Sequence, residues 1–317
     1  MPVAPSHNGG RAANGRPFRL RRSQLAVPAS NPRMMEKAAL SEADEVFLDL
    51  EDAVAPSKKP EARKLLVTAL GELDFGKRTV CYRINGLDTS WWYEDVIQVV
   101  SAAGDRIHDL MIPKVETPGQ VEAVDLLLAQ VEANAGLEPG RIGLEAQIEG
   151  PRGAANAREI ARASPRLEAL IFGPGDFAAA VGMPTPMIGD DAPYESHAWH
   201  AILSWLVWSG KAAGLAVLDG PYARIDDAAG YRRSCERARF LGVDGKWAIH
   251  PDQIPIANEV FAPTKEQTAR AVHVLSVYEK ALAEGKGALK LDGEMVDAAT
   301  LRMANTTIAT ARAAGLL

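Results

Sequence analysis

Polar side chains follow seven of the short apolar segments that recur along this chain. Their types are those that carry out acid–base, electrostatic and metal chemistry. The positions are Glu51-Asp52, Arg83-Ile84-Asn85-Gly86, Pro113-Lys114, Glu149, Asp176, Asp219-Gly220 and His250-Pro251. A single aspartate at the end of a strand is as often a turn residue as a functional one. Seven such ends in succession indicate one site, built where the segments terminate.

Glu149 and Asp176 are the most specific pair in this set. They follow neighbouring apolar segments, and no cysteine lies near either of them. A small number of hard carboxylate oxygens suits Mg²⁺, which fills its octahedron with water and substrate oxygens. We therefore predict a magnesium site at Glu149 and Asp176, and the alternative is an ordinary pair of loop carboxylates.

Arg83 supplies a permanent cation that can grip a carboxylate or enolate oxygen with two N–H groups. The alternative is a structural salt bridge, for which Glu51 or Asp52 could be the partner. His250 is ambiguous, because a histidine before a proline is often a structural hydrogen-bonding residue. Arg83 is thus the stronger catalytic candidate of the two.

Eight apolar segments, separated by stretches with helical patterning, must position these side chains. They are residues 23–27, 45–50, 79–84, 109–113, 142–148, 168–173, 214–218 and 243–249. They lack a clean period of two, as expected for parallel strands that are covered on both sides. Eight βα units over about 240 residues predict a TIM (β/α)8 barrel, with its chemistry at the carboxyl ends of the strands. A doubly wound sheet is the alternative, but no G-x-G-x-x-G follows the first segment.

The chain extends beyond the predicted barrel at both ends. Residues 1–16 are rich in Gly, Pro and Asn and have no periodicity, which predicts a disordered N-terminal arm. The barrel is expected to span residues 17–262. Residues 263–317 contain two helical stretches joined by the Gly/Lys-rich loop EGKGALKLDG, and they predict a helical extension. Because that loop is polar and flexible in composition, we expect residues 286–317 to form a hinged lid.

The composition excludes several classes of function. The net charge of −6 argues against a dedicated nucleic-acid binder. No run approaches the ~18 apolar residues of a membrane span. There is no secretory signal, so we expect a cytoplasmic protein, with an organellar transit peptide as the alternative. Two cysteines, Cys81 and Cys235, are too few for a disulfide framework; Cys81 is expected in the core and Cys235 on a helix.

The motifs that contain these residues carry a family resemblance. In chain order they are LDLEDAVAP, RINGLDT, WYEDV, MIPKVE, QIEGPRG, FGPGDFAAAVGM, LDGPY and GKWAIHPDQ. Together they resemble the citrate lyase β-subunit and malyl-CoA lyase family of the HpcH/HpaI aldolase superfamily. Within it, RINGLDT and GKWAIHP are most similar to the L-malyl-CoA/β-methylmalyl-CoA lyases. The resemblance implies a TIM barrel, a magnesium ion (with Mn²⁺ as a substitute) and reversible carbon–carbon cleavage of a 3-hydroxyacyl-CoA.

The resemblance also implies roles for particular residues. By motif match, Glu149 and Asp176 are the metal ligands, and Arg83 holds the oxygen of the oxo acid. Arg33 and Lys37, in NPRMMEK, match positions that contact the phosphates of coenzyme A.

Two further carboxylates are candidates for catalysis. Asp297, in VDAATLRMA, matches a lid aspartate that reaches the site of a neighbouring subunit. It is the first candidate for moving the proton at the α-carbon of the thioester, and Glu51 is the second. A shared lid implies a homo-oligomer, and a trimer or hexamer is expected.

The expected reaction is Mg²⁺-dependent cleavage of L-malyl-CoA, or β-methylmalyl-CoA, to acetyl-CoA, or propionyl-CoA, and glyoxylate. The alternatives are a malyl-CoA thioesterase and a citramalyl-CoA or citryl lyase β-type subunit. The non-enzymatic alternative is an inactive barrel that serves as a scaffold. The expected partners are the CoA thioester and a 2-oxo acid, with neither nucleic acid nor membrane.

Overall fold

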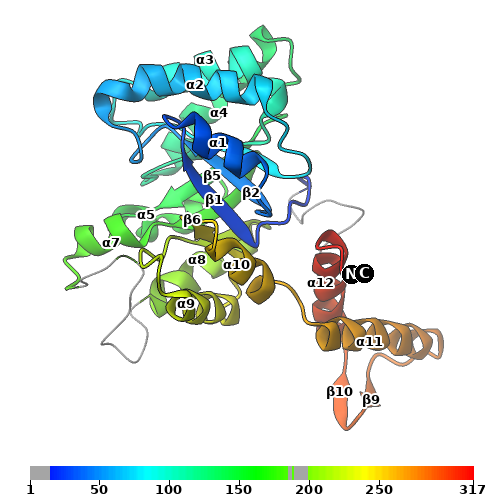
Figure 1. Ribbon diagram of the computed structural model, residues 1–317. Helices are drawn as coiled ribbons and strands as arrows, with labels where there is room; N and C mark the ends of the chain where they lie inside the picture. The colour runs from blue at the N-terminus through cyan, green and yellow to red at the C-terminus, as the bar shows by residue number, and fades with distance from the viewer. Residues whose placement is uncertain (1–14, 185–187, 189–198) are drawn as a thin grey trace. The chain divides into compact units, whose positions relative to one another are not determined.

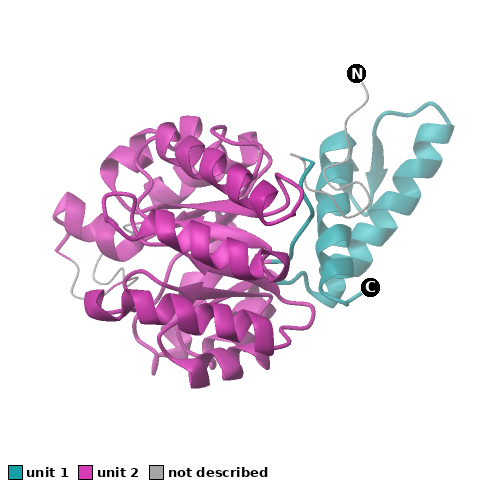
Figure 2. Ribbon diagram, turned by 90° about the horizontal axis from the view of Figure 1, so that it is seen from above, with its two compact units in different colours: residues 1–20, 262–317 teal, residues 21–261 magenta. Residues whose placement is uncertain are grey.

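The computed structural model describes residues 15–184, 188 and 199–317 (Figure 1). The predicted N-terminal arm, residues 1–16, lies outside the described residues except for its last two positions. The chain divides into two compact units, residues 21–261 and residues 1–20 with 262–317 (Figure 2). We call them the barrel unit and the C-terminal unit. Their boundaries fall within a few residues of the predicted ones.

Eight parallel strands close into a barrel in the order of the sequence, which confirms the predicted TIM barrel. The barrel closes because β1 pairs with β8, with Ser23 opposite Lys246 and Leu25 opposite Ala248. Each predicted apolar segment overlaps one strand. The strands are β1 (Ser23–Pro28), β2 (Glu45–Asp49), β3 (Thr79–Arg83), β4 (Asp109–Ile112), β5 (Gly143–Ile148), β6 (Leu167–Phe172), β7 (Ala216–Asp219) and β8 (Gly245–Ala248).

Helices connect the strands and cover the barrel (Figure 1). Their starts carry the expected signals: the Asn31 side chain accepts a hydrogen bond from Met34 N at the start of α1, and Pro follows directly at the first helical position. The helices of the barrel unit are α1 (Pro32–Ala39), α2 (Lys59–Glu72), α3 (Trp92–Ala103), α4 (Pro118–Asn134), α5 (Pro151–Ala155), α6 (Ala157–Ile160), α7 (Pro174–Val181), α8 (His200–Ala212), α9 (Ala228–Phe240) and α10 (Gln253–Phe261), with 3₁₀ turns η1 (Pro56–Lys58) and η2 (Gly104–Arg106).

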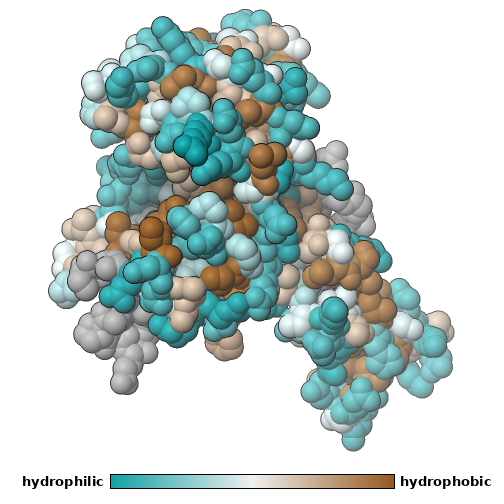
Figure 3. Space-filling model, in the orientation of Figure 1, coloured by the Kyte–Doolittle hydropathy of each residue, from teal (hydrophilic) through white to brown (hydrophobic). Residues whose placement is uncertain are grey.

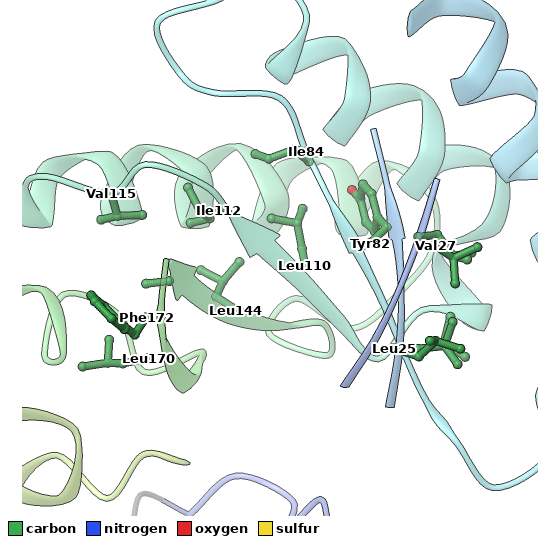
Figure 4. Packing of buried hydrophobic residues seen from close by; sticks show 14 of the residues in the cluster. Leu25, Val27, Tyr82, Ile84, Leu110, Ile112, Val115, Leu144, Leu170 and Phe172 are labelled. Carbon is green, nitrogen blue, oxygen red and sulfur yellow. The ribbon is translucent and has the colours of Figure 1, made fainter. Parts of the chain in front are cut away.

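Alternate residues of the strands belong to two separate apolar clusters. Tyr82, Leu110, Leu144 and Phe172 are in the large cluster between strands and helices (Figure 4). The second cluster fills the barrel interior, and its buried members are Phe47, Cys81, Met111, Ala169, Ile171, Leu218 and Trp247. Since side chains alternate along a strand, the residues two before and two after an interior residue also face the interior. On β2 and β5 the residues that face the interior are polar at both ends of the strand. Charged groups therefore lie at both ends of the barrel interior.

A buried ion cluster occupies the interior at the amino ends of the strands. Arg21 Nε donates to Glu45 at 2.8 Å and to Glu145 at 2.9 Å, and Arg21 Nη2 donates to Asp109 at 2.8 Å and to Glu168 at 2.9 Å. Four strands are thereby tied to one side chain. Among the described residues, Glu45, Cys81 and Glu145 form the one set of three side chains close enough to share a metal ion. Because Arg21 already donates to both of these carboxylates, the set is an ion cluster and not a metal site.

The C-terminal unit has its own small apolar core. Helix α11 (Lys265–Ala283) packs against α12 (Ala298–Ala313), and the buried core residues are Ala271, Val274, Tyr278, Val296, Ala304 and Ile308. Thr264 and Gln267 cap α11 reciprocally, with Thr264 N donating to Gln267 Oε1 at 3.0 Å and Gln267 N donating to Thr264 Oγ1 at 3.1 Å. Figure 3 shows hydrophobic residues among hydrophilic ones on the surface of this unit, and Met295 is 73% exposed.

The loop predicted to be flexible, EGKGALKLDG, contains regular structure instead. Strands β9 (Leu289–Leu291) and β10 (Glu294–Val296) form an antiparallel hairpin. Its two-residue turn, Asp292-Gly293, has φ values of 51° and 89°. Two positive φ values define a type I′ turn, and Asp-Gly is a strong sequence signal for it. The second half of the predicted flexible loop is therefore ordered, because Asp-Gly favours a hairpin turn, a signal that the sequence interpretation overlooked.

In the described part of the chain, none of the helices has both the length and the apolar character needed to cross a membrane.

Candidate active site

The predicted site residues of the barrel unit gather at the carboxyl ends of neighbouring strands, which we call the barrel mouth. Arg83 is the last residue of β3, and Glu149 directly follows β5. Glu51 lies two residues after β2, Lys114 two residues after β4, and Asp176 in the first turn of α7. The positions follow from the parallel topology, which brings all carboxyl ends to one face.

Arg83 is held rigidly by groups that the sequence reasoning missed. Its Nε and Nη2 each donate to Asp49 at 2.7 Å, and its Nη1 donates to Gln147 at 3.1 Å. The guanidinium also lies 5.7 Å from the ring of Phe47 and 5.4 Å from that of Trp247. Glu51, named as a possible partner in the salt-bridge alternative, does pair with Arg83 at 3.3 Å, but Asp49 is the closer partner.

Asp49 accepts four hydrogen bonds. Besides Arg83, it accepts from the main-chain N–H of Glu51 at 2.9 Å and of Ala53 at 3.1 Å. Burial alone would raise the pKa of Asp49, but the charge and hydrogen bonds of Arg83 hold that pKa below its ordinary value. Asp49 thus connects Arg83 to the turn that carries Glu51. Arg83 uses its Nε and one Nη2 hydrogen to bind both oxygens of Asp49. A substrate can therefore bind only to the remaining N–H groups of Arg83.

Asp49 and Gln147 could have been predicted from the alternation of side chains along a strand, which has a period of two residues. Glu51 and Glu149 were predicted at the ends of their strands, and the residues two positions earlier share the same interior face. The period of two was overlooked because the outward positions, such as Leu48 and Ile148, make both strands appear uniformly apolar. Trp247 had no comparable signal, because a tryptophan in a strand most often belongs to the core.

Glu149 is a buried carboxylate, 5% exposed, with both oxygens oriented by hydrogen bonds. Its Oε1 accepts from the main-chain N–H of Lys114 at 2.8 Å, and its Oε2 accepts from the Gln147 side chain at 2.8 Å. Burial, together with the charges of Asp176 and Glu51 and against that of Arg83, raises the pKa of Glu149 to about 8. Because the surroundings disfavour the negative charge of the Glu149 carboxylate, a cation bound beside it would be stabilised.

The motif FGPGD brings the backbone against Glu149. A Cβ on Gly173 would lie 2.4 Å from Glu149 Cβ and 2.6 Å from Glu149 Oε2. No other residue than glycine fits this approach without a shift. Pro174 then starts α7, and Asp176 follows in its first turn with its side chain 49% exposed. One carboxylate of the predicted pair is therefore buried and the other faces solvent.

Lys114 contacts both members of this pair. Its main-chain N–H binds Glu149, and its ammonium lies 3.8 Å from Asp176 Oδ2. The ammonium also donates to Glu51 at 2.5 Å and to Asp52 at 3.3 Å. Two hard carboxylates, one of them buried with a raised pKa, fit the donor chemistry of a magnesium site with open positions for water and substrate. Glu149 and Asp176 therefore suit the predicted magnesium ion.

Glu51 is fixed by its main chain as well as by its side chain. Lys59, which is buried, donates to the carbonyls of Leu50 at 3.0 Å and Glu51 at 2.9 Å. Burial and Asp52 raise the pKa of Glu51 against the opposing charges of Arg83 and Lys114, and the net shift is upward from 4.5. A carboxylate held next to two cations, with a raised pKa, is suited to proton transfer.

Other strand-end residues have structural roles. Asp219 pairs with the buried Lys246, and Asn85 donates its main-chain and side-chain N–H to Asp95 at 2.9 and 2.6 Å. His250 contacts Asp252 of its own loop at 3.5 Å, which agrees with the structural interpretation.

Three predicted residues lie outside this cluster. Arg33 and Lys37 are exposed on α1. Asp297 belongs to the C-terminal unit and caps α12, accepting from Ala299 N at 2.9 Å and Thr300 N at 3.0 Å. These hydrogen bonds lower its pKa.

Taken together, the fold and site define a (β/α)8-barrel enzyme with acidic residues, an arginine and a lysine at the barrel mouth. The model of the HpcH/HpaI aldolase/citrate lyase family matches residues 22–251, and the chain belongs to this family of carbon–carbon lyases acting on CoA esters. It is 43% identical to the L-malyl-CoA/beta-methylmalyl-CoA lyase of Rhodobacter capsulatus over 92% of this chain and 95% of that protein. It is 36% identical to the (3S)-malyl-CoA thioesterase of Cereibacter sphaeroides over 95% of this chain and 97% of that protein.

A solved structure gives the same placement in the family. Protein CitE from Mycobacterium tuberculosis, in complex with magnesium, acetoacetate and coenzyme A, is 30% identical with a TM-score of 0.71. The match covers 92% of this chain and 97% of that one.

Proposed function

We propose that this protein is a Mg²⁺-dependent lyase that cleaves L-malyl-CoA, or β-methylmalyl-CoA, reversibly to acetyl-CoA, or propionyl-CoA, and glyoxylate. The observation that carries the proposal is the pair Glu149 and Asp176 beside the clamped Arg83 at the barrel mouth. The identity to the Rhodobacter capsulatus lyase supports the choice of substrate.

Glu149 and Asp176 would hold the magnesium ion. When bound, the ion supplies a Lewis acid that polarises the oxygens of the malyl or glyoxylate unit. In cleavage, the malyl hydroxyl gives up its proton and its oxygen becomes the aldehyde oxygen of glyoxylate. The bond between the hydroxyl-bearing carbon and the α-carbon of the thioester breaks, and its electron pair moves into the thioester carbonyl to give an enolate. Arg83 would stabilise negative charge on the oxo-acid oxygen, an electrostatic contribution of about 3 kcal/mol for one well-placed donor. Asp49 keeps the guanidinium fixed, so little reorganisation is needed during the reaction.

A carboxylate must then transfer a proton at the α-carbon of acetyl-CoA. Asp297 is the first candidate, on the family resemblance, and Glu51 is the second, on its position beside Arg83 and Lys114. Exchange of the acetyl-CoA α-protons in D2O isolates this step. Asp297→Asn should abolish exchange while Glu51→Gln retains it; the reverse result assigns the role to Glu51.

A product assay tests the reaction. The purified protein is incubated with Mg²⁺ and L-malyl-CoA, β-methylmalyl-CoA or citramalyl-CoA, and the released acids are identified. Glyoxylate and acetyl-CoA are expected from L-malyl-CoA. These thioesters differ by a methyl group, which changes discrimination by only about 1–3 kcal/mol, so all three must be compared. If the protein cleaves none of the three thioesters, the proposal is overturned.

The second candidate is a malyl-CoA thioesterase, because the Cereibacter sphaeroides enzyme of that name is 36% identical over nearly the full chain. The same assay separates the two functions. Free malate and coenzyme A, without glyoxylate, would show hydrolysis.

We further propose that residues 286–317 form a lid that brings Asp297 to the site of a neighbouring subunit in a trimer or hexamer, and that Arg33 and Lys37 contact coenzyme A. Mixed oligomers of Asp297→Asn and Glu149→Gln, each inactive alone, test the shared lid. A site that combines an intact barrel with an intact lid should recover part of the activity. No recovery in verified mixed oligomers would place Asp297 outside the partner's site.

A further inference from the structure

The backbone at Lys114 has an unusual conformation. Its φ is 51°, and the other described non-glycine residue with positive φ is Asp292, in the hairpin turn. The left-handed region is uncommon for residues with a Cβ, and it is retained where the surroundings fix it. At Lys114 no hairpin requires it, so the constraint comes from the barrel mouth.

Two main-chain hydrogen bonds fix this turn. Lys114 N donates to Glu149 Oε1 at 2.8 Å, and Val115 N donates to the Gln147 carbonyl at 3.0 Å. The left-handed turn after β4 therefore orients one of the proposed metal ligands through the main chain.

The side chain of Lys114 links the remaining carboxylates of the mouth. Its ammonium lies 2.5 Å from Glu51, 3.3 Å from Asp52 and 3.8 Å from Asp176. Partial burial would lower the pKa of Lys114, but the hydrogen bond and charge of Glu51, with Asp52 and Asp176, raise it above its ordinary value. Arg83, the other cation, is bound by Asp49. Lys114 is 41% exposed at its side chain, so it is the cation that can move when a metal binds.

We propose that Lys114 is a positioning residue that sets the magnesium affinity of this site: its main chain orients Glu149, and its ammonium competes with the metal for Asp176 while neutralising Glu51. The inference rests on the metal site in the proposed function. It predicts a sign that a purely structural lysine would not give. Removing the ammonium should strengthen magnesium binding, because a cation that opposes Mg²⁺ is lost while the carboxylates stay.

Calorimetric titration of the metal-free protein with MgCl2 tests this. Lys114→Met keeps most of the length of the side chain, being one atom shorter, and removes its charge. Lys114→Gly also removes the charge and suits the positive φ, so it serves if the Met variant does not fold. Both should bind Mg²⁺ about tenfold or more tightly than the wild type. Lys114→Arg, which keeps the charge, and Lys211→Met, which removes an exposed lysine paired with Asp244, should stay within about twofold of it.

Unchanged or weaker magnesium binding in folded Lys114→Met and Lys114→Gly would overturn the inference. The same titration of the wild type separates this failure from that of the proposed function. If the wild type itself binds no Mg²⁺, the metal assignment fails; if it binds normally and the variants match it, only the role of Lys114 is wrong.

Discussion

The clamp between Asp49 and Arg83 gives the sharpest prediction. Asp49→Asn keeps the size of the side chain but replaces one carboxylate oxygen with an NH2 group. Each oxygen of Asp49 accepts one N–H from Arg83 and one from the main chain of residues 51 or 53. Whichever way the amide turns, its NH2 faces two donors, so two hydrogen bonds are lost.

The expected cost follows from burial. Asp49 is 2% exposed and Arg83 5% exposed, so the guanidinium cannot replace its partner with bulk water. Removing one partner of a buried ion pair costs about 3–5 kcal/mol in the free energy of unfolding. In addition, Arg83 is free to turn toward Glu51, and a displacement of about 1 Å in a catalytic group can cost about a hundredfold in kcat/KM.

Urea unfolding and steady-state kinetics measure the two effects. Asp52→Asn is the matched control, because the Asp52 side chain is 59% exposed and pairs with Lys114 at 3.3 Å; this variant should change the free energy of unfolding by less than about 0.5 kcal/mol. A double-mutant cycle with Arg83→Met should give a coupling free energy of about 2–3 kcal/mol. Additivity of the two single substitutions within about 0.5 kcal/mol would refute the clamp.

Three other predictions concern single side chains. Glu149→Gln and Asp176→Asn should each remove most of the activity and weaken Mg²⁺ binding by at least about tenfold, while circular dichroism stays unchanged; wild-type turnover at limiting Mg²⁺ in either variant would contradict the metal assignment. Arg83→Lys should lose nearly as much kcat/KM as Arg83→Ala, because a point charge cannot satisfy Asp49 with two N–H groups and still contact substrate; near-normal kinetics would mean that net charge alone is needed. Burial and the neighbouring Glu45 raise the pKa of Glu145 well above 4.5, so its carboxyl contributes stability below pH 4.5 that is lost as the pH rises through its native pKa. The free energy of unfolding of Glu145→Gln, which imitates the protonated carboxyl, should therefore gain on that of the wild type as the pH rises above 4.5. A difference that does not change with pH would show that the pKa of Glu145 is not shifted.

The order of the strands and the residues at their ends could be predicted from the sequence. Eight apolar segments with helical stretches between them allow few other arrangements, and a parallel barrel brings their carboxyl ends together. Glu149, Arg83 and Lys114 were found because each directly follows or ends its segment. These are local signals, and they need no knowledge of tertiary contacts.

The partners of these residues were harder to predict. For Arg83, the sequence suggested Glu51 or Asp52 as possible salt-bridge partners and did not suggest Asp49. Arg83 pairs with Asp49 because β2 and β3 are in register, with Asp49 opposite Arg83. The register between two strands is a tertiary property. The sequence indicated the Asp49–Arg83 pair only through the period of two along β2. The positive φ of Lys114 likewise had no sequence signal.

The two ends of the barrel show why similar carboxylates can have different roles. Glu45 and Asp49 lie on the same interior face of β2, and Glu145 and Glu149 on that of β5. At the amino ends of the strands, Arg21 is 4% exposed and donates to four buried carboxylates, so the hydrogen bonds of that cluster are made internally and stabilise the fold. At the carboxyl ends, Arg83 is taken up by Asp49, and the ammonium of Lys114 is shared among Glu51, Asp52 and Asp176 at increasing distances. Burial, together with the charges of Asp176 and Glu51 and against that of Arg83, raises the pKa of Glu149 to about 8. The two ends differ in access: the four carboxylates around Arg21 are buried, whereas Asp176 at the barrel mouth is 49% exposed and can meet a metal ion from solvent.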